Sequence, residues 1–370
     1  MAKQSIMNKS ELTNFLDCGA ILQVGADQYK LVWGPFTAEP FDLALVSGGK
    51  TIIYKPDFWD FTLDDHDKKT AFVGTQEAVV EREQLLELLN QQEHVDFNIA
   101  WSPVNEADFV EQFEWSQSQF KIGALSKTVP IISQNGAVLF SKAHLAKALI
   151  SILSEKHYGS TYGFWQNTEG YLGHTPELIL EWDAKDHAVK TMALAGTLPP
   201  GKENEYAIMH DPKILDEHQI VVNDMLGVLQ KANPTQKIEI EKLKVLELKY
   251  LLHLQTKIQL PQIEASEVQK YIQAIHPTAA LGLFPRKSSA YREFKKFVIQ
   301  SIRQNFAAPF AFINKNQIKA IAAIRLFYFD PTGVKITSGC GVTVGSILAD
   351  ELKELENKRN SVKRMMGMNV

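Results

Sequence analysis

Residues 318–358 read IKAIAAIRLFYFDPTGVKITSGCGVTVGSILADELKELENK, and this stretch decides the fold that the sequence predicts. Two apolar runs, Ile318–Phe329 and Val334–Ser338, flank Asp330-Pro331-Thr332-Gly333, whose proline and glycine suit a tight turn, so they predict a β-hairpin. A glycine-rich segment then leads into a helix over about Leu348–Met365. Strands broken by single helices, without a regular β-α-β alternation, favour an α/β protein of the layered α+β kind.

Three charged side chains share one face of that last helix. Glu351 and Glu354 are three positions apart and Lys358 lies four beyond Glu354, so helical geometry stacks them. One interpretation is a solvated face with an ordinary Glu-to-Lys pair, worth only about 0.2–0.5 kcal/mol. The other is a metal or anion site. The glycine-rich turn 338–346 favours the second, because it lets backbone N–H groups approach an anion near the positive end of the helix.

The rest of the chain alternates irregularly between helices and strands. Helical spacing of apolar residues predicts helices at Glu77–Gln92, Lys142–Lys156, Ile214–Lys231, Glu267–Ile275 and Ser289–Asn305. Strand-like runs are Ala20–Val24, Tyr29–Trp33, Leu43–Val46, Thr51–Tyr54, Thr161–Gln166, Leu178–Trp182, Val189–Ala195 and Lys244–Leu260. There is no Gly/Ser-rich linker and no internal repeat, and we expect a single structural domain.

The composition is that of an ordinary globular protein. The chain has 370 residues, 45% of them hydrophobic and 22% charged, which is enough to bury a full core. A net charge of −4 gives no electrostatic reason to expect nucleic-acid binding, and apolar runs such as Ala143–Leu153 are too short to span a membrane. Two cysteines, Cys18 and Cys340, cannot make a disulfide framework or a thiolate zinc site. Because the N-terminal residues show no secretory signal, we expect a cytoplasmic protein that binds neither nucleic acid nor membranes.

A second acidic element, Asp216-Glu217-His218, lies inside the helix expected at Ile214–Lys231. Glu217 is either a surface carboxylate beside a histidine at the edge of the core, or a ligand held at a buried boundary. Ligation by carboxylates from separate helices, without a cluster of cysteines or histidines, would favour Mg²⁺ over Zn²⁺.

Three further charged residues stand in apolar surroundings. Lys127 is either a strand-edge lysine that reaches water or a half-buried lysine; burial disfavours the ammonium form, so a half-buried lysine could act as a base. Glu177, at the start of an apolar strand, is either a general acid or a strand-end charge. Arg325 needs a partner, which is either an internal carboxylate or the carboxylate of a substrate.

Taken in order, these pieces resemble the chorismate-utilising enzymes, a family that includes isochorismate, salicylate, anthranilate and aminodeoxychorismate synthases. The matching segments, within about residues 120–365, are Thr175-Pro176-Glu177-Leu178, Ala195-Gly196-Thr197, Glu217-His218, His253-Leu254-Gln255-Thr256, His276-Pro277-Thr278 with Phe284-Pro285-Arg286, Ile324-Arg325, Gly339-Cys340-Gly341 and Glu351-x-x-Glu354-x-x-Asn357-Lys358. The resemblance implies large antiparallel β-sheets flanked by helices, with the active site in a central cleft. Within one domain, it implies a chorismate-binding catalytic portion at residues 111–370 and an N-terminal variable portion at residues 1–110.

The resemblance also implies a role for each matching residue. Glu217 and Glu354 would ligate Mg²⁺ directly and Glu351 through water, and the metal would hold the ring carboxylate of chorismate. The enolpyruvyl carboxylate or its surroundings would be bound by Arg325, Lys358 and the backbone at Gly339 and Gly341. The other implied substrate-binding residues are Ala195, Gly196, Thr197, His253 and Thr256.

Two positions distinguish the branches of the family. Lys127 matches the lysine with which isochorismate and salicylate synthases activate water for attack on C2, and the ammonia-using branches lack it. Ala195 stands where the aminodeoxychorismate branch often has a nucleophilic lysine. We therefore expect an isochorismate synthase, a Mg²⁺-dependent isomerase with Lys127 as base. Glu177 would protonate the departing C4 hydroxyl, and burial should raise its pKa.

Other hypotheses stay open at this point. A salicylate synthase would add elimination of pyruvate at the same site, and the chain resembles an anthranilate or aminodeoxychorismate synthase component less closely. A catalytically idle relative would only bind a ligand or a partner. The product could feed menaquinone or a catechol siderophore, and the protein could be a monomer or a homodimer. The sequence departs from the family pattern at Ile131-Ile132, His174, Ile214 and Ile347-Leu348.

Overall fold

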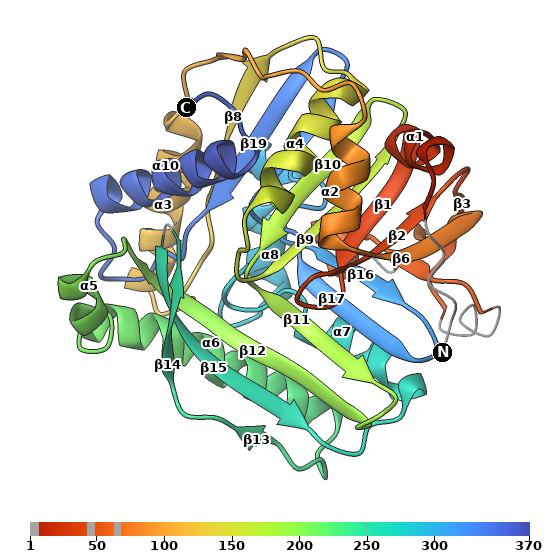
Figure 1. Cartoon of the computed structure of the whole chain (residues 1–370). Coiled ribbons are helices and arrows are strands. Elements are labelled where there is room, and N and C mark those ends of the chain that lie inside the picture. Colours follow the sequence, from red (N-terminus) through yellow and green to blue (C-terminus); the bar gives the residue numbers. More distant parts are fainter. Residues whose placement is uncertain (1–6, 43–48, 63–67, 250) are drawn as a thin grey trace.

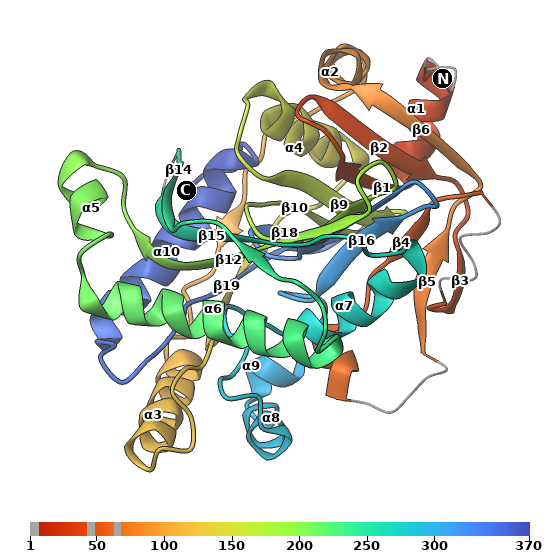
Figure 2. The same cartoon turned by 90° about the horizontal axis from the view of Figure 1, so that it is seen from below.

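The computed structural model describes residues 7–42, 49–62, 68–249 and 251–370, and two large antiparallel sheets dominate it (Figure 1). In the view from below, the sheets are stacked, and helices cover the outer side of each (Figure 2). The fold class expected from the sequence, large antiparallel sheets flanked by helices, is confirmed.

The first sheet has nine strands. Their order is β6 (Gln76–Glu81), β2 (Gln28–Trp33), β1 (Cys18–Gln23), β9 (Ser160–Gln166), β10 (Glu169–Thr175), β18 (Leu326–Asp330), β19 (Gly333–Gly339), β8 (Ile131–Ala137) and β7 (Ala100–Trp101). Its outer face is covered by α1 (Lys9–Asp17), α2 (Arg82–Asn90) and α4 (Lys142–Ser154). Buried residues such as Phe15, Leu149 and Trp165 form one apolar cluster there, and removing such surface from water is the main force that holds this layer.

The second sheet has ten strands. Their order is β13 (Glu239–Ile240), β15 (Leu251–Leu260), β12 (Ala188–Leu198), β11 (Leu178–Asp183), β17 (Gln317–Ala322), β16 (Pro309–Ile313), β4 (Ile52–Tyr54), β5 (Lys69–Val73) and β3 (Thr37–Pro40), and β14 (Lys244–Leu248) pairs with β15. It is covered by α6 (Pro212–Ala232) and α7 (Val268–Ile275). The remaining helices are α3 (Ala107–Lys121), α5 (Lys202–Ala207), α8 (Ser288–Phe294), α9 (Val298–Ser301), α10 (Leu348–Met365) and the short 3₁₀ turns η2 (Phe58–Thr62) and η3 (Ala265–Glu267).

Aromatic rings join the inner faces of the two sheets. Phe310 of β16 lies 5.5 Å from Tyr162 of β9 and 6.0 Å from Tyr171 of β10, measured between ring centroids. The chain passes from the second sheet to the first between β17 and β18, where Arg325 adopts a φ of 55°. The prediction of one strand over Ile318–Phe329 was therefore wrong: two strands of different sheets are joined by a left-handed residue. The second half of the predicted hairpin, β18 to β19, is confirmed.

Most predicted elements are confirmed, and two helices need correction. Glu77–Gln92 divides into strand β6 and helix α2, because alternating Ala78 and Val80 are buried against β2 before the helical spacing begins. Ser289–Asn305 contains two short helices, α8 and α9, in place of one long helix. The run Leu43–Val46 lies outside the described residues.

Strands from the N-terminal third complete both sheets, with β1, β2, β6 and β7 in the first and β3, β4 and β5 in the second. The division of the chain at residue 110 stays a prediction. In the part of the chain that the structure describes, no helix has the length and apolarity needed to cross a membrane.

Candidate active site

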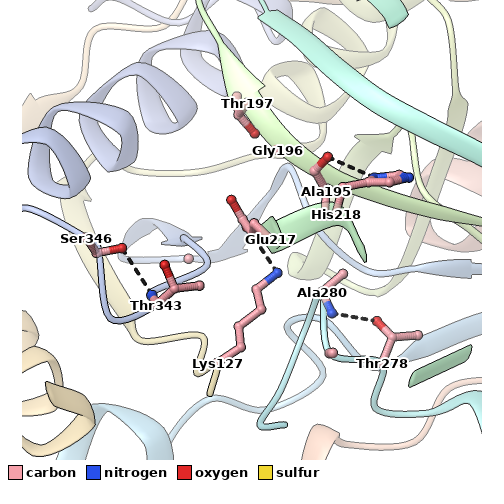
Figure 3. A network of polar contacts seen from close by, with 12 residues as sticks. Lys127, Ala195, Gly196, Thr197, Glu217, His218, Thr278, Ala280, Thr343 and Ser346 are labelled. Carbon is pink, nitrogen blue, oxygen red and sulfur yellow. Dashed lines mark hydrogen bonds and ion pairs between the residues drawn. The ribbon is translucent and has the colours of Figure 1, made fainter. Parts of the chain in front are cut away.

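One pocket gathers most of the residues predicted for the site. It lies where the glycine-rich turn after β19, the Lys127 segment and the end of β12 meet (Figure 3). Its lining includes Lys127, Glu177, Ala195, Gly196, Thr197, Glu217, His253, Arg325, Gly339, Gly341, Glu354 and Lys358. Segments spread from Lys127 to Val362 therefore converge on one cavity, as the resemblance implied.

Lys127 is buried, with only 1% of its surface exposed, so the strand-edge interpretation is wrong. The backbone explains its position: the Lys127 N–H donates to Phe284 O at 3.2 Å, and the neighbouring Thr128 N–H donates to Val342 O at 3.0 Å. The Nζ atom forms an ion pair with Oε1 of Glu217 at 3.0 Å (Figure 3). The candidate base is thus fixed between two chain segments and contacts a candidate metal ligand.

Gly341 forms the wall beside this pair. A Cβ atom at this position would lie 2.1 Å from Oε1 of Glu217 and 2.6 Å from Cε of Lys127. Neither group could give way without breaking the pair, so any side chain here would fill the pocket. The second glycine of Gly339-Cys340-Gly341 is therefore required by the close approach of the Glu217 and Lys127 side chains to the backbone.

Glu177 directly precedes β11 and lines the pocket with 7% of its surface exposed. Burial raises the pKa of its carboxyl from 4.5 to about 7, against the opposing charges of Lys127, Lys358 and Arg325. The expectation of a raised pKa is confirmed. A carboxyl of this kind carries a proton near neutral pH and can donate it.

Arg325 lines the same pocket and is partly buried. Its Nη1 donates to Oγ of Ser361 at 2.9 Å, and among the described residues no carboxylate lies within ion-pair distance of it. Burial lowers its pKa to about 10, so the guanidinium is charged at neutral pH. Lys358, which donates to Gly339 O at 2.9 Å and pairs with Oε1 of Glu354 at 2.5 Å, adds a second cation. These two groups give the pocket an affinity for an anion.

Each of the three predicted metal ligands forms an ion pair with a lysine. The pairs are Lys127–Glu217 at 3.0 Å, Lys213–Glu351 at 3.0 Å and Lys358–Glu354 at 2.5 Å. Across the described ranges, no three His, Cys, Asp or Glu side chains are already arranged around a metal position. The donor chemistry nevertheless fits a hard divalent cation, because the donors are carboxylate oxygens and a Cβ at Gly341 would occupy the place beside one of them.

Glu351 is not on the pocket wall but lies behind it, with 3% of its surface exposed. Burial and the charge of Glu354 raise its pKa, although Lys213 opposes the shift. That Glu351 acts on the metal through water stays a prediction.

Ala195, Gly196 and Thr197 lie at a β-bulge near the end of β12, where Gly196 has a φ of 80°, and two histidines contact them. His218 Nδ1 donates to Ala195 O at 3.2 Å, and its Nε2 lies 2.9 Å from Oγ1 of Thr256. Burial lowers the pKa of His218 to about 4, so the ring is neutral and its Nε2 accepts from the threonine. Thr256, which was predicted to bind the substrate, is not on the pocket wall. Its hydroxyl instead orients His218, which supports the backbone at Ala195.

His253, in contrast, lines the pocket as predicted. Burial, together with the charges of Arg325 and Lys358, lowers its pKa to about 3, so this ring is also neutral. Its Nδ1 lies 3.1 Å from Oγ1 of Thr197 and 3.3 Å from Gly196 O.

The sequence analysis missed two groups of residues. Lys213, which pairs with Glu351, gave no signal because a surface lysine in the first turn of a helix is common. The apolar wall of the pocket was also missed, since such residues look like core from sequence; it consists of Val129, Leu194, Ala280, Leu281, Phe306, Ala307, Ile324 and Val362.

The motif Phe284-Pro285-Arg286 supports the site without entering it. Arg286 binds both carboxylate oxygens of buried Asp224 on α6, each at 2.7 Å, and donates to the carbonyls of Ala274 and Ile275. Asp224 also accepts from the Ala279 N–H at 2.8 Å. This network fixes the loop that carries Ala280 and Leu281 on the pocket wall.

We expect Arg286→Met to lower the free energy of unfolding by about 3–5 kcal/mol, because it leaves the Asp224 carboxylate buried without its cation. Urea unfolding followed by circular dichroism measures this change. Arg292→Met, at an exposed position of α8, is the matched control and should stay within about 0.5 kcal/mol of the wild type. Equal midpoints for the two variants would contradict the role given to Arg286.

Comparison with known proteins adds to this geometry. A family described as chorismate binding enzyme matches residues 60–367. Isochorismate synthase MenF of Escherichia coli (strain K12) is 27% identical over 216 residues, which cover 56% of this chain and 48% of that protein. Isochorismate synthase MenF of Pasteurella multocida (strain Pm70) is 27% identical over 282 residues, covering 72% of this chain and 62% of that protein.

The solved structure of the menaquinone-specific isochorismate synthase MenF from Escherichia coli has the same fold, with a TM-score of 0.76 at 18% identity, over 99% of this chain and 92% of that one. In sequence, the chain spans about half to three fifths of the length of the two curated relatives it matches. The family match covers most of the chain and includes every segment that contributes to the pocket. The chain belongs to the chorismate binding enzyme family.

Proposed function

We propose that this protein is an isochorismate synthase, which converts chorismate to isochorismate. The observation that carries the proposal is that buried Lys127 and Glu177, whose pKa is about 7, line one pocket with two cationic groups, Arg325 and Lys358. Relatives named isochorismate synthase support the same activity. Ala195 at the end of β12 supports it further, because it leaves no amine there for an aminodeoxychorismate-type reaction.

The reaction adds water at C2 of the ring and expels the C4 hydroxyl as the ring double bonds shift. The free amine of Lys127, released from its ion pair with Glu217, accepts a proton from the attacking water, and Glu177 gives its proton to the departing oxygen. Lys127 ends this step as the ammonium and Glu177 as the carboxylate, so one proton is taken up and one is given. Each such transfer typically contributes about 10²–10⁴-fold to the rate. Arg325, Lys358 and the backbone at Gly339 and Gly341 bind the enolpyruvyl carboxylate and hold the ring in place.

Glu217 and Glu354 are the proposed direct ligands of Mg²⁺, with Glu351 acting through water. When bound, this ion would supply positive charge for the ring carboxylate of the substrate. The proposal places the enzyme in the cytoplasm, as a monomer or homodimer, in a pathway to menaquinone or a catechol siderophore.

The proposal predicts that purified protein with Mg²⁺ and chorismate forms isochorismate, and that EDTA stops the reaction. Isochorismate is measured with excess isochorismatase as coupling enzyme, and equilibration from added isochorismate tests reversibility. Absence of the isochorismate signal at saturating chorismate and Mg²⁺ would rule the activity out.

A parallel assay separates the alternative hypothesis. Salicylate synthase activity would release pyruvate, which lactate dehydrogenase detects, together with fluorescent salicylate. We expect isochorismate without either signal.

A further inference from the structure

We propose that Lys213 is a built-in counter-ion of the metal site, which competes with the divalent cation for Glu351 and keeps the affinity for the metal alone low. This inference rests on the proposed function, because it takes the three carboxylates as the metal site. It assigns a role to a residue that neither the catalytic mechanism nor the family motifs use.

The geometry places Lys213 in contact with one proposed ligand. Its Nζ lies 3.0 Å from Oε1 of Glu351, a side chain with 3% of its surface exposed. The two residues belong to different helices: Lys213 is in the first turn of α6 and Glu351 in the first turn of α10. The glycine-rich turn packs close by, since a Cβ at Gly345 would lie 3.9 Å from Cγ of Lys213.

Lys213 completes the charge balance of the cluster of proposed ligands. Three ammonium groups, those of Lys127, Lys213 and Lys358, thus balance three carboxylates. A divalent ion that enters this cluster meets a site whose negative charge is already neutralised.

The position of Lys213 on α6 is unfavourable for the helix itself. A cation in the first turn of a helix opposes the helix dipole. The other two lysines have their own tasks, Lys127 as the proposed base on the pocket wall and Lys358 as a donor to the carbonyl of Gly339. Lys213 is also the most exposed of the three, with 38% of its side-chain surface exposed against 1% and 15%. It can therefore move into solvent when a metal binds, which the other two cannot do as readily.

The test is metal binding without substrate, measured on the full chain. Titration with MgCl₂ in a calorimeter, and with Mn²⁺ followed by the electron paramagnetic resonance of the free ion, gives dissociation constants for each variant. We expect Lys213→Met to bind both ions about tenfold more tightly than the wild type, because it removes the competing charge. Lys213→Arg keeps the charge and should stay near the wild type.

Lys353→Met is the matched control. Lys353 is on α10 and pairs with Glu356 at the exposed surface, so its removal should leave metal affinity unchanged. Lys213→Gln serves as a second charge-removing variant in case the methionine variant folds poorly. Unchanged or weaker metal binding in the folded Lys213→Met or Lys213→Gln variant would overturn the inference.

The same titrations distinguish this failure from failure of the proposed function. Absence of Mg²⁺ and Mn²⁺ binding to the wild type and to both charge-removing Lys213 variants overturns the metal site, and the inference with it. A wild type that binds Mg²⁺ but forms no isochorismate overturns the activity alone, and the comparison between variants then still decides the role of Lys213.

Discussion

Glu177→Gln is expected to lower kcat for isochorismate formation by about 10²–10⁴-fold while changing KM little. The amide has nearly the shape of the carboxylic acid, but it cannot donate a proton to the departing C4 oxygen. The coupled isochorismatase assay measures both constants. Glu181→Gln, on the strand β11 that follows Glu177 but outside the pocket wall, is the control and should keep wild-type turnover.

The pH profile of the wild type tests the same residue independently. Glu177 acts in its protonated form, and its pKa is about 7. The rate of isochorismate formation should therefore fall as the pH rises through about 7. A profile that stays flat from pH 6 to pH 8, with substrate saturating and metal bound, would contradict Glu177 as the acid.

Thermal unfolding distinguishes lost chemistry from lost structure. In the fold the pKa of Glu177 is raised from 4.5 to about 7, so the native state holds a proton that the unfolded chain releases between these values. Glu177 thus makes the native state less stable as the pH rises from about 4.5 to 7. At pH 8, Glu177→Gln should melt at the same temperature as the wild type or higher, and inactivity cannot then be attributed to unfolding.

The sequence predicts helices and strands well where one spacing of apolar residues, either helical or strand-like, persists along a segment. The last helix was expected over Leu348–Met365, and α10 has these bounds. The predicted bounds are wrong where the spacing of apolar residues changes within a segment, or where the backbone turns within an apolar run. Arg325 interrupts Ile318–Phe329 with a single left-handed residue, and nothing in the local apolar pattern shows that the chain changes sheets there. The pairing of the N-terminal strands with both sheets also depends on contacts distant in sequence.

The site was predictable to the extent that its residues stand in ordered motifs. The structure brings four residues from separate motifs together in one cavity: Lys127, Glu177, Arg325 and Glu354. The motifs did not show which groups contact each other, because the Lys127–Glu217 pair joins segments from different parts of the chain. They also did not separate residues that line the pocket from those that support it, as Thr256 shows through its hydrogen bond to His218.

Lys127→Gln is expected to lower kcat by about 10²–10⁴-fold, because the amide cannot accept a proton from the attacking water. Lys127 occupies a position with 1% exposure in contact with Glu217, so the substitution also leaves that carboxylate without its ammonium partner. Loss of this partner should tighten, not weaken, the binding of Mg²⁺ at Glu217. A mere structural defect would instead weaken both metal binding and catalysis.

A lower kcat together with tighter binding of Mg²⁺ in Lys127→Gln would therefore identify Lys127 as a base beside a metal ligand. Calorimetric titration with MgCl₂ and the coupled assay measure them on the same preparation. Lys121→Gln, at the exposed end of α3, is the control and should match the wild type in both. If Lys127→Gln and Glu177→Gln both turned over chorismate at the wild-type rate, the pocket would not be the site of the chemistry. Among the described residues, no other pair of groups on the pocket wall combines a buried amine with a protonated carboxyl.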